Sequence, residues 1–256
     1  MMGKKLKGGL APVDLTSMSD LLRTMKEAWP TLYLHSANVA NLALRICTFL
    51  RLSEVEQETI IAGAFLHDIG KMFVRREIIE KPGPLSDEEW AELKEHPRRG
   101  ASIVAARGGD NSLVEIIRYH HERWNGKGYE GLRGQMIPWS ARVIALADAL
   151  DAMTSLRPYR QPSKMCDALE EVYDGAGSQF DPQLIRALAE KPFWQIVTYR
   201  DPGRLERQID EEKKWLDQLV DSYATLSHPL VYAQSQWLDR LLVLNLKDMQ
   251  PAGADK

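Results

Sequence analysis

Apolar residues recur at helical spacing along most of the chain, from position 19 to about position 190. No strand-like alternation longer than a few residues interrupts this pattern, so it predicts an all-α fold. One helix is expected to begin near Tyr33, and its apolar face is formed by Val39, Leu42, Ala43 and Ile46.

Capping signals predict where several helices begin and end. Ser53 is expected to cap the next helix, and Gly70 is placed to end it. Ser86 is followed three residues later by Glu89, which predicts a capping box that opens another helix. We expect His96 near the end of that helix.

The apolar spacing divides the chain into a larger domain and a smaller appendage. We expect a flexible segment over residues 1–18, the main helical domain over 19–190, a connector over 191–203 and a hairpin over 204–256. Two amphipathic helices, separated by a break at residues 227–229, predict that the hairpin is antiparallel.

Composition limits the location and the partners of the protein. Hydrophobic residues make up 44% of the 256 residues and charged residues 27%, as in an ordinary globular protein. The net charge of -3 argues against a nucleic-acid polymer as a partner. The basic start MMGKKLKGGL precedes no apolar run long enough for a signal peptide or a membrane span. Two cysteines, Cys47 and Cys166, form no disulfide framework, so we expect a cytoplasmic protein.

Histidine and aspartate residues form the most informative pattern in the chain. Five of the six histidines lie between positions 35 and 121. A single helical histidine is usually a packed or surface residue, but the pairs His67-Asp68 and His120-His121 follow apolar helix faces, where unpaired polar groups are costly. Asp148 likewise interrupts the apolar segment ALADALDAM. The candidate metal ligands are His35, His67, Asp68, His96, His120, His121 and Asp148.

These ligands predict a metal centre that works on phosphate esters. Imidazole and carboxylate ligands without thiolate suit iron, manganese, zinc or nickel. Seven ligands exceed what one ion usually takes, so we expect two ions with Asp68 as the bridge. A pair of ions generates hydroxide at neutral pH and offsets the charge of a phosphodiester.

Six segments resemble the successive motifs of HD-GYP domains. They are HS (35–36), HDIGK (67–71), LKEHPRRGASI (93–103), HHERWNGKGY (120–129), IPWSARVIALADALDAMTSLRPYR (137–160) and GSQFDP (177–182). The resemblance covers roughly residues 20–190 and implies an HD-domain helical bundle. Members of this family are bacterial phosphodiesterases that open cyclic di-GMP and sometimes related cyclic dinucleotides.

The resemblance also implies a role for individual residues. It assigns one ion to His35, His67, Asp68 and Asp148, and the other to Asp68, His96, His120 and His121. Lys71 is similar to a lysine that contacts the scissile phosphate and protonates the leaving oxygen, although a solvated helix-end charge explains it equally well. Arg157 and Arg160 resemble residues that hold the second phosphate, and helix-end capping is their alternative explanation. Asp151 is expected to accept a hydrogen bond from a ligand rather than to bind an ion.

Three positions depart from the family pattern. Thr31 stands where some members carry a glutamate for a third metal, so we expect only two divalent ions, iron or manganese. The loop from Gly128 to Leu132 keeps Tyr129 for stacking or hydrogen bonding but lacks the usual proline. Glu130 would repel an anionic ligand if it pointed inward. Phe73 replaces a glycine and is expected to narrow the cleft.

The C-terminal segment over residues 204–246 resembles a second family. Its sequence SQWLD matches the Ser-Gln-x-Leu-Asp motif of two-helix aspartyl-phosphate phosphatases from spore-forming bacteria. Those proteins dephosphorylate the master response regulator of sporulation. The resemblance implies functional roles for Ser235, Gln236 and Asp239, whereas a plain dimerisation or docking hairpin is the simpler alternative.

The sequence therefore predicts a phosphodiesterase that linearises a cyclic dinucleotide, with a hairpin that acts on or docks a phosphorylated response regulator. One alternative is a regulatory module that senses a cyclic dinucleotide and hydrolyses it weakly. Another is a general HD nucleotide phosphohydrolase, against which the SLRPYR and GSQFDP motifs count.

Overall fold

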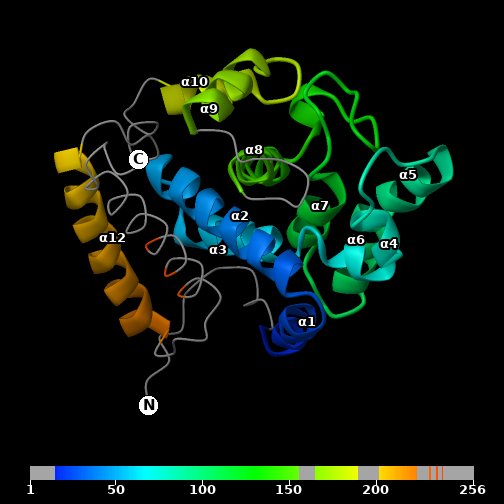
Figure 1. The fold of residues 1–256 in the computed structure, drawn as a ribbon, viewed down its shortest axis with the longest axis horizontal. Coiled ribbons are helices and arrows are strands. Elements are labelled where there is room, and N and C mark those ends of the chain that lie inside the picture. Colours follow the sequence, from blue (N-terminus) through cyan, green and yellow to red (C-terminus); the bar gives the residue numbers. More distant parts are fainter. Residues whose placement is uncertain are drawn as a thin grey trace, which may run out of the picture.

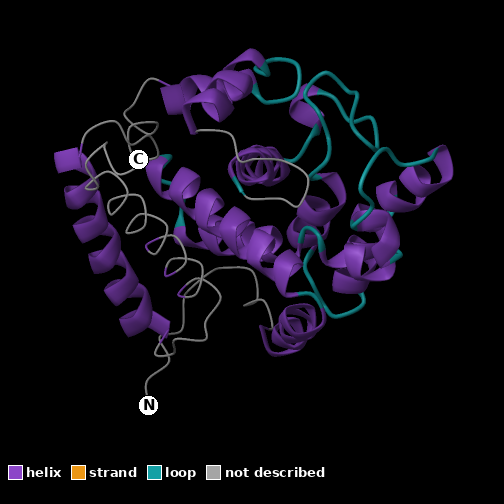
Figure 2. Cartoon of the chain, viewed as in Figure 1, coloured by secondary structure: helices purple, strands orange, loops and turns teal. Residues whose placement is uncertain are grey.

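A computed structural model describes residues 15–155, 165–189 and 202–223, together with Val231, Ser235 and Leu238. The described residues form helices and loops, with no strand among them, which confirms the predicted all-α fold (Figure 2). The helices are α1 (Leu15–Ala28), α2 (Pro30–Phe49), α3 (Glu54–Leu66), α4 (Arg76–Ile79), α5 (Asp87–Lys94), α6 (His96–Ala105), α7 (Asn111–Tyr119), α8 (Trp139–Thr154), α9 (Met165–Asp174), α10 (Pro182–Ala189) and α12 (Pro202–Tyr223). Short 3-10 helices η1 (Ile69–Phe73) and η2 (Gly134–Met136) complete the list.

Helix α2 lies at the centre of the fold and packs against α1, α3 and α8 (Figure 1). Both α2 and α8 are apolar over most of their surface, so each is buried by neighbours on several sides. The main apolar core lies between α2, α3, α8, α9 and α10. A second core joins α1 to η1, α6 and α7.

Local capping signals position the helices that carry the site. Ser86 and Glu89 form the predicted capping box at the start of α5, and the predicted cap Ser53 forms a second capping box with Glu56 at the start of α3. Helix α2 begins at Pro30, three residues before the expected start, because proline fits the first turn of a helix.

Two expected domain boundaries differ from the observed helix ends. Helix α1 begins at Leu15, inside the segment that we expected to be flexible. Helix α12 begins at Pro202, inside the expected connector. Leu15 and Met18 extend the helical apolar spacing at the start of α1, whereas α12 starts early because proline fits the first turn of a helix.

Helix α12 is fastened to α2 by a buried ion pair between Arg45 and Glu212. The Arg45 guanidinium donates to both carboxylate oxygens of Glu212, at 2.6 and 2.7 Å. Trp215 lies against the same guanidinium, 4.9 Å from ring centroid to Cζ. The hairpin's second segment is described only at three helical positions, of which Val231 and Leu238 are buried. None of the described helices is both long and apolar enough to cross a lipid bilayer.

Candidate metal centre

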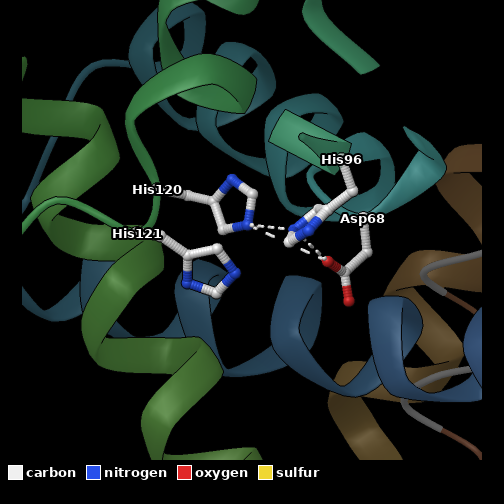
Figure 3. A group of neighbouring side chains, drawn as sticks. All are labelled: Asp68, His96, His120 and His121. Atoms are coloured by element: carbon white, nitrogen blue, oxygen red, sulfur yellow. Dashed lines mark hydrogen bonds and ion pairs between the residues drawn. The ribbon is translucent and has the colours of Figure 1, made fainter. Parts of the chain in front are cut away.

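The fold brings all seven predicted ligands together from five helices. His35 lies on α2, His67 and Asp68 follow α3, and His96 opens α6. His120 and His121 follow the end of α7, and Asp148 lies on α8. Two ligand groups result, Asp68 with His96, His120 and His121 (Figure 3), and Asp68 with His35 and His67. Within each group the ligand atoms lie within 4.8 Å of one another.

Asp68 faces both groups with different oxygens. Its Oδ1 lies 3.1 Å from His96 Nε2 and 3.8 Å from His120 Nε2. Its Oδ2 lies 3.5 Å from His35 Nε2 and 3.4 Å from His67 Nε2. The Asp68 carboxylate therefore turns one oxygen toward each ligand group and belongs to both.

Gly70 allows the start of α6 to approach Asp68. A Cβ atom at this position would lie 1.9 Å from the carbonyl oxygen of His96 and 2.8 Å from the amide nitrogen of Gly100. The prediction that Gly70 ends a helix is wrong, because it lies inside η1 and serves close packing. His96 lies two residues past the end of α5, close to where it was expected, and it opens α6 with Pro97 in the first turn.

Backbone carbonyls fix the orientation of three ligand histidines. The Nδ1 atoms of His67, His96 and His120 each lie 2.7 Å from a carbonyl oxygen three residues earlier. A carbonyl only accepts, so Nδ1 carries the hydrogen and Nε2 turns its lone pair toward the centre. This is the tautomer that a metal-binding histidine requires.

Several lone pairs in this centre face each other without a hydrogen to share. His96 Nε2 and His120 Nε2 are 3.4 Å apart, and burial lowers the pKa of both rings, which disfavours a second proton on either ring. His67 Nε2 and Asp68 Oδ1 are buried and have no hydrogen-bond partner. Facing acceptors of this kind are costly on their own and are satisfied by a cation, so the donor set fits a metal site.

His35 lies among three carboxylates. Its Nε2 is 3.2 Å from Asp148, and its Nδ1 is 2.7 Å from Asp151, which accepts a further hydrogen bond from Ser155. Burial opposes protonation, but hydrogen bonds that the ring donates to Asp148, Asp151 and Asp68 raise the pKa of His35 well above its ordinary value. The same arrangement holds the pKa of Asp148 below its ordinary range despite burial. This side of the centre is strongly negative and favours a cation.

Lys71 reaches the centre from η1. Its Nζ lies 2.6 Å from Asp68 Oδ2, and its side chain is half-buried. Despite burial, the lysine together with His67 and His35 holds the pKa of Asp68 well below its ordinary value.

A cleft of about 480 Å³ opens beside the ligands and reaches His120, His121, Asp148 and Tyr129. Three cations that line this cleft were not among the predicted site residues, namely Lys94, Arg123 and Lys127. No residue in the described part of the chain forms an ion pair with any of them. Arg123 and Lys127 follow the ligands His120 and His121 within the segment HHERWNGKGY. This closeness in the sequence could have identified them as residues of the cleft. Unpaired cations beside a metal centre suit a phosphorylated ligand.

The altered loop is held by charged side chains instead of a proline. Glu130 bonds to Arg98 at 2.6 and 3.0 Å and lies 3.5 Å from Arg118, so its charge is paired and is absent from the cleft lining. The buried Glu122 carboxylate accepts hydrogen bonds from the backbone amides of Glu130 and Leu132. A Cβ at Gly128 would lie 2.5 Å from Glu122, so the tight loop requires glycine.

Two further expectations are resolved differently. Phe73 does not narrow the cleft, because it is 58% exposed and lines a separate hollow beside Arg99. Arg157, Arg160, Gln236 and Asp239 lie outside the described residues.

The helical fold and the shared aspartate define a protein with a candidate two-group His/Asp metal centre. The chain belongs to the HD domain family, whose model matches residues 17–184. A second model, Spo0E like sporulation regulatory protein, matches residues 205–244. Both matches confirm the resemblances found in the sequence.

Several characterised relatives share the HD part of the chain. The cyclic di-GMP phosphodiesterase response regulator RpfG of Xanthomonas campestris pv. campestris is 40% identical over 144 residues, which cover 54% of this chain and 38% of that protein. The 3'3'-cGAMP-specific phosphodiesterase 2 of Vibrio cholerae is 33% identical over 196 residues, covering 71% of this chain and 38% of that protein. The matched part thus spans well under half of each relative.

Solved structures agree in fold. Bd1817 from Bdellovibrio bacteriovorus has a TM-score of 0.53 at 23% identity, over 69% of this chain and 58% of that one. The HD domain of L. monocytogenes phosphodiesterase PgpH has a TM-score of 0.52 at 18% identity, over 69% of this chain and 96% of that one.

Proposed function

We propose that this chain is a metal-dependent phosphodiesterase that opens a cyclic dinucleotide, cyclic di-GMP or 3'3'-cGAMP, to a linear product. The observation that carries the proposal is Asp68, whose two oxygens face separate ligand groups beside a cleft lined by unpaired cations. Relatives named as cyclic di-GMP and 3'3'-cGAMP phosphodiesterases support the choice of substrate.

Two divalent ions, iron or manganese, would be held by the seven ligands and would supply the Lewis acidity that activates water and offsets phosphate charge. Lys71 lies beside the bridging carboxylate, where its ammonium donates a proton to the sugar oxygen as the phosphorus–oxygen bond breaks. Arg123 and Lys127 would hold the phosphate that is not attacked. We assign the same task to Arg157 and Arg160 from the motif alone.

Chromatography of cyclic dinucleotides tests this function. Protein loaded anaerobically with Mn²⁺ or Fe²⁺ is expected to convert cyclic di-GMP or 3'3'-cGAMP to a linear product, and chelator is expected to stop the conversion. Binding of the cyclic dinucleotide without product would favour the sensing module instead. Turnover of mononucleotides, with both cyclic substrates untouched, would favour a general nucleotide phosphohydrolase.

A second candidate function belongs to the hairpin. We propose that it docks a phosphorylated response regulator and dephosphorylates it through Ser235, Gln236 and Asp239. The match of residues 205–244 to the sporulation regulatory family supports this role. Of the described positions in this segment, Ser235 is partly exposed, while Val231 and Leu238 are buried.

Replacing Asp239 with alanine is expected to abolish dephosphorylation of a phosphorylated response regulator while the unfolding temperature stays unchanged. Asp217→Ala is the matched control, because this exposed aspartate lies on α12 outside the motif. Leu238→Ala should instead destabilise the packing by about 2 kcal/mol, since the side chain is only 8% exposed. If the unaltered chain leaves the regulators intact and Asp239→Ala binds them equally, the hairpin is a docking or dimerisation element.

A further inference from the structure

An aromatic corner with a cation in it forms one wall of the cleft. Trp90 and Tyr129 meet edge to face, with ring centroids 6.3 Å apart and planes at 80°. The Lys94 Nζ lies 5.4 Å from the Trp90 centroid and 5.5 Å from the Tyr129 centroid. All three residues line the cleft.

The corner is anchored by contacts on both sides and adjoins the metal ligand His121. Trp90 and Lys94 are four residues apart on α5, so they share one face of that helix. The helix is tied to the preceding loop by Glu89, which lies 2.5 Å from Lys81, and its start is fixed by a capping box. On the other side the Tyr129 ring is stacked at a tilt on His121, 4.6 Å between centroids. A phosphate held at the ligands would therefore place an attached sugar and base against this wall.

Trp90 and Lys94 each offer a contact that a nucleobase can use. Trp90 is 42% exposed although it is a large aromatic side chain at a cleft, so part of the indole surface is accessible to a stacking base. Lys94 is exposed, and no carboxylate in the described part of the chain pairs with it, unlike Lys71 or Lys81. An ammonium only donates hydrogen bonds, so it matches the O6 and N7 acceptors of guanine and meets the N6 amino group of adenine poorly.

We propose that Trp90, Lys94 and Tyr129 form a guanine-binding subsite, in which Trp90 stacks on the base and Lys94 reads its O6 and N7 edge. This inference rests on the proposed cyclic-dinucleotide phosphodiesterase function and names the base that the cleft selects. Stacking is blind to the identity of the purine, whereas the contact with Lys94 is specific, so the two residues have separable effects.

Calorimetric titration with the hydrolysis-resistant bisphosphorothioate analogues of cyclic di-GMP and cyclic di-AMP tests the subsite on the full chain loaded with Mn²⁺. The unaltered chain is expected to bind the guanine analogue about tenfold more tightly than the adenine analogue. Lys94→Met should remove that preference by weakening the guanine analogue alone, and Lys94→Arg should retain it. Trp90→Leu should weaken both analogues about tenfold or more.

Matched controls are Lys213→Met and Phe73→Leu, which remove an exposed lysine and an exposed aromatic ring away from the cleft. Both are expected to bind as the unaltered chain does. The subsite is refuted if Lys94→Met keeps the preference or if Trp90→Leu binds both analogues normally. If the binding pattern holds while neither natural cyclic dinucleotide is hydrolysed, the subsite stands and the phosphodiesterase function fails.

Discussion

Replacing Asp68 with alanine is expected to remove both metal binding and hydrolysis, because one carboxylate faces both ligand groups. Elemental analysis of protein purified without chelator and reloaded anaerobically should give two ions per chain before the change and fewer than one after it. Chromatography of the cyclic dinucleotide should then detect no linear product. Retention of two ions by the variant would refute the bridging role.

Lys71→Met provides the comparison within the same centre. Its ammonium lies 2.6 Å from Asp68, but an ammonium is no metal ligand, so the variant should keep its ions. Turnover should fall about 10²- to 10⁴-fold, the usual contribution of a general acid. Equal loss of metal in the two variants would mean that Lys71 supports the ligands rather than the proton transfer.

Replacing Glu212 with alanine is expected to destabilise the protein by about 3–5 kcal/mol, because it removes the carboxylate that neutralises the buried Arg45 guanidinium. The side chains of Arg45 and Glu212 are only 7% and 5% exposed. Urea unfolding measures the loss, and limited proteolysis of α12 reports whether that helix detaches first.

Asp20→Ala is the matched control for this ion pair. The pair of Asp20 with Arg23 is about two-thirds exposed on both sides, so breaking it should cost no more than about 1 kcal/mol. The double variant Arg45→Met with Glu212→Leu should lose less stability than Glu212→Ala, since no unpaired charge remains. Equal costs for Glu212→Ala and Asp20→Ala would show that burial adds nothing to the pair.

Features set by neighbouring residues were predictable from the sequence. The predicted cap at Ser53 and the predicted capping box at Ser86 both occur, because each depends on a partner three residues away. The ligand set was visible because imidazole and carboxylate groups interrupt apolar helix faces. The role of Gly70 in close packing was not visible in the sequence. It depends on the His96 carbonyl, which only the folded chain brings near Gly70.

Contacts between distant segments escaped prediction for the same reason. Arg45 and Glu212 are 167 residues apart, and each alone resembles an ordinary helical surface charge. The place of Trp90 in the cleft wall was not predicted either, because its ring meets Tyr129 of a later loop only in the folded chain. Glu130 was expected to disturb an anionic ligand, and its pairing with Arg98 could not be seen in the local sequence.

Helix α2 carries two contacts whose spacing along the helix sets their relative orientation. His35 serves the metal centre, and Arg45, ten residues later on the same helix, holds the hairpin. Removing or adding one residue between them would rotate one contact by about 100° relative to the other. An insertion or deletion in this stretch would therefore displace either His35 from the metal ligands or Arg45 from Glu212. A substitution would leave the relative orientation of the two contacts unchanged.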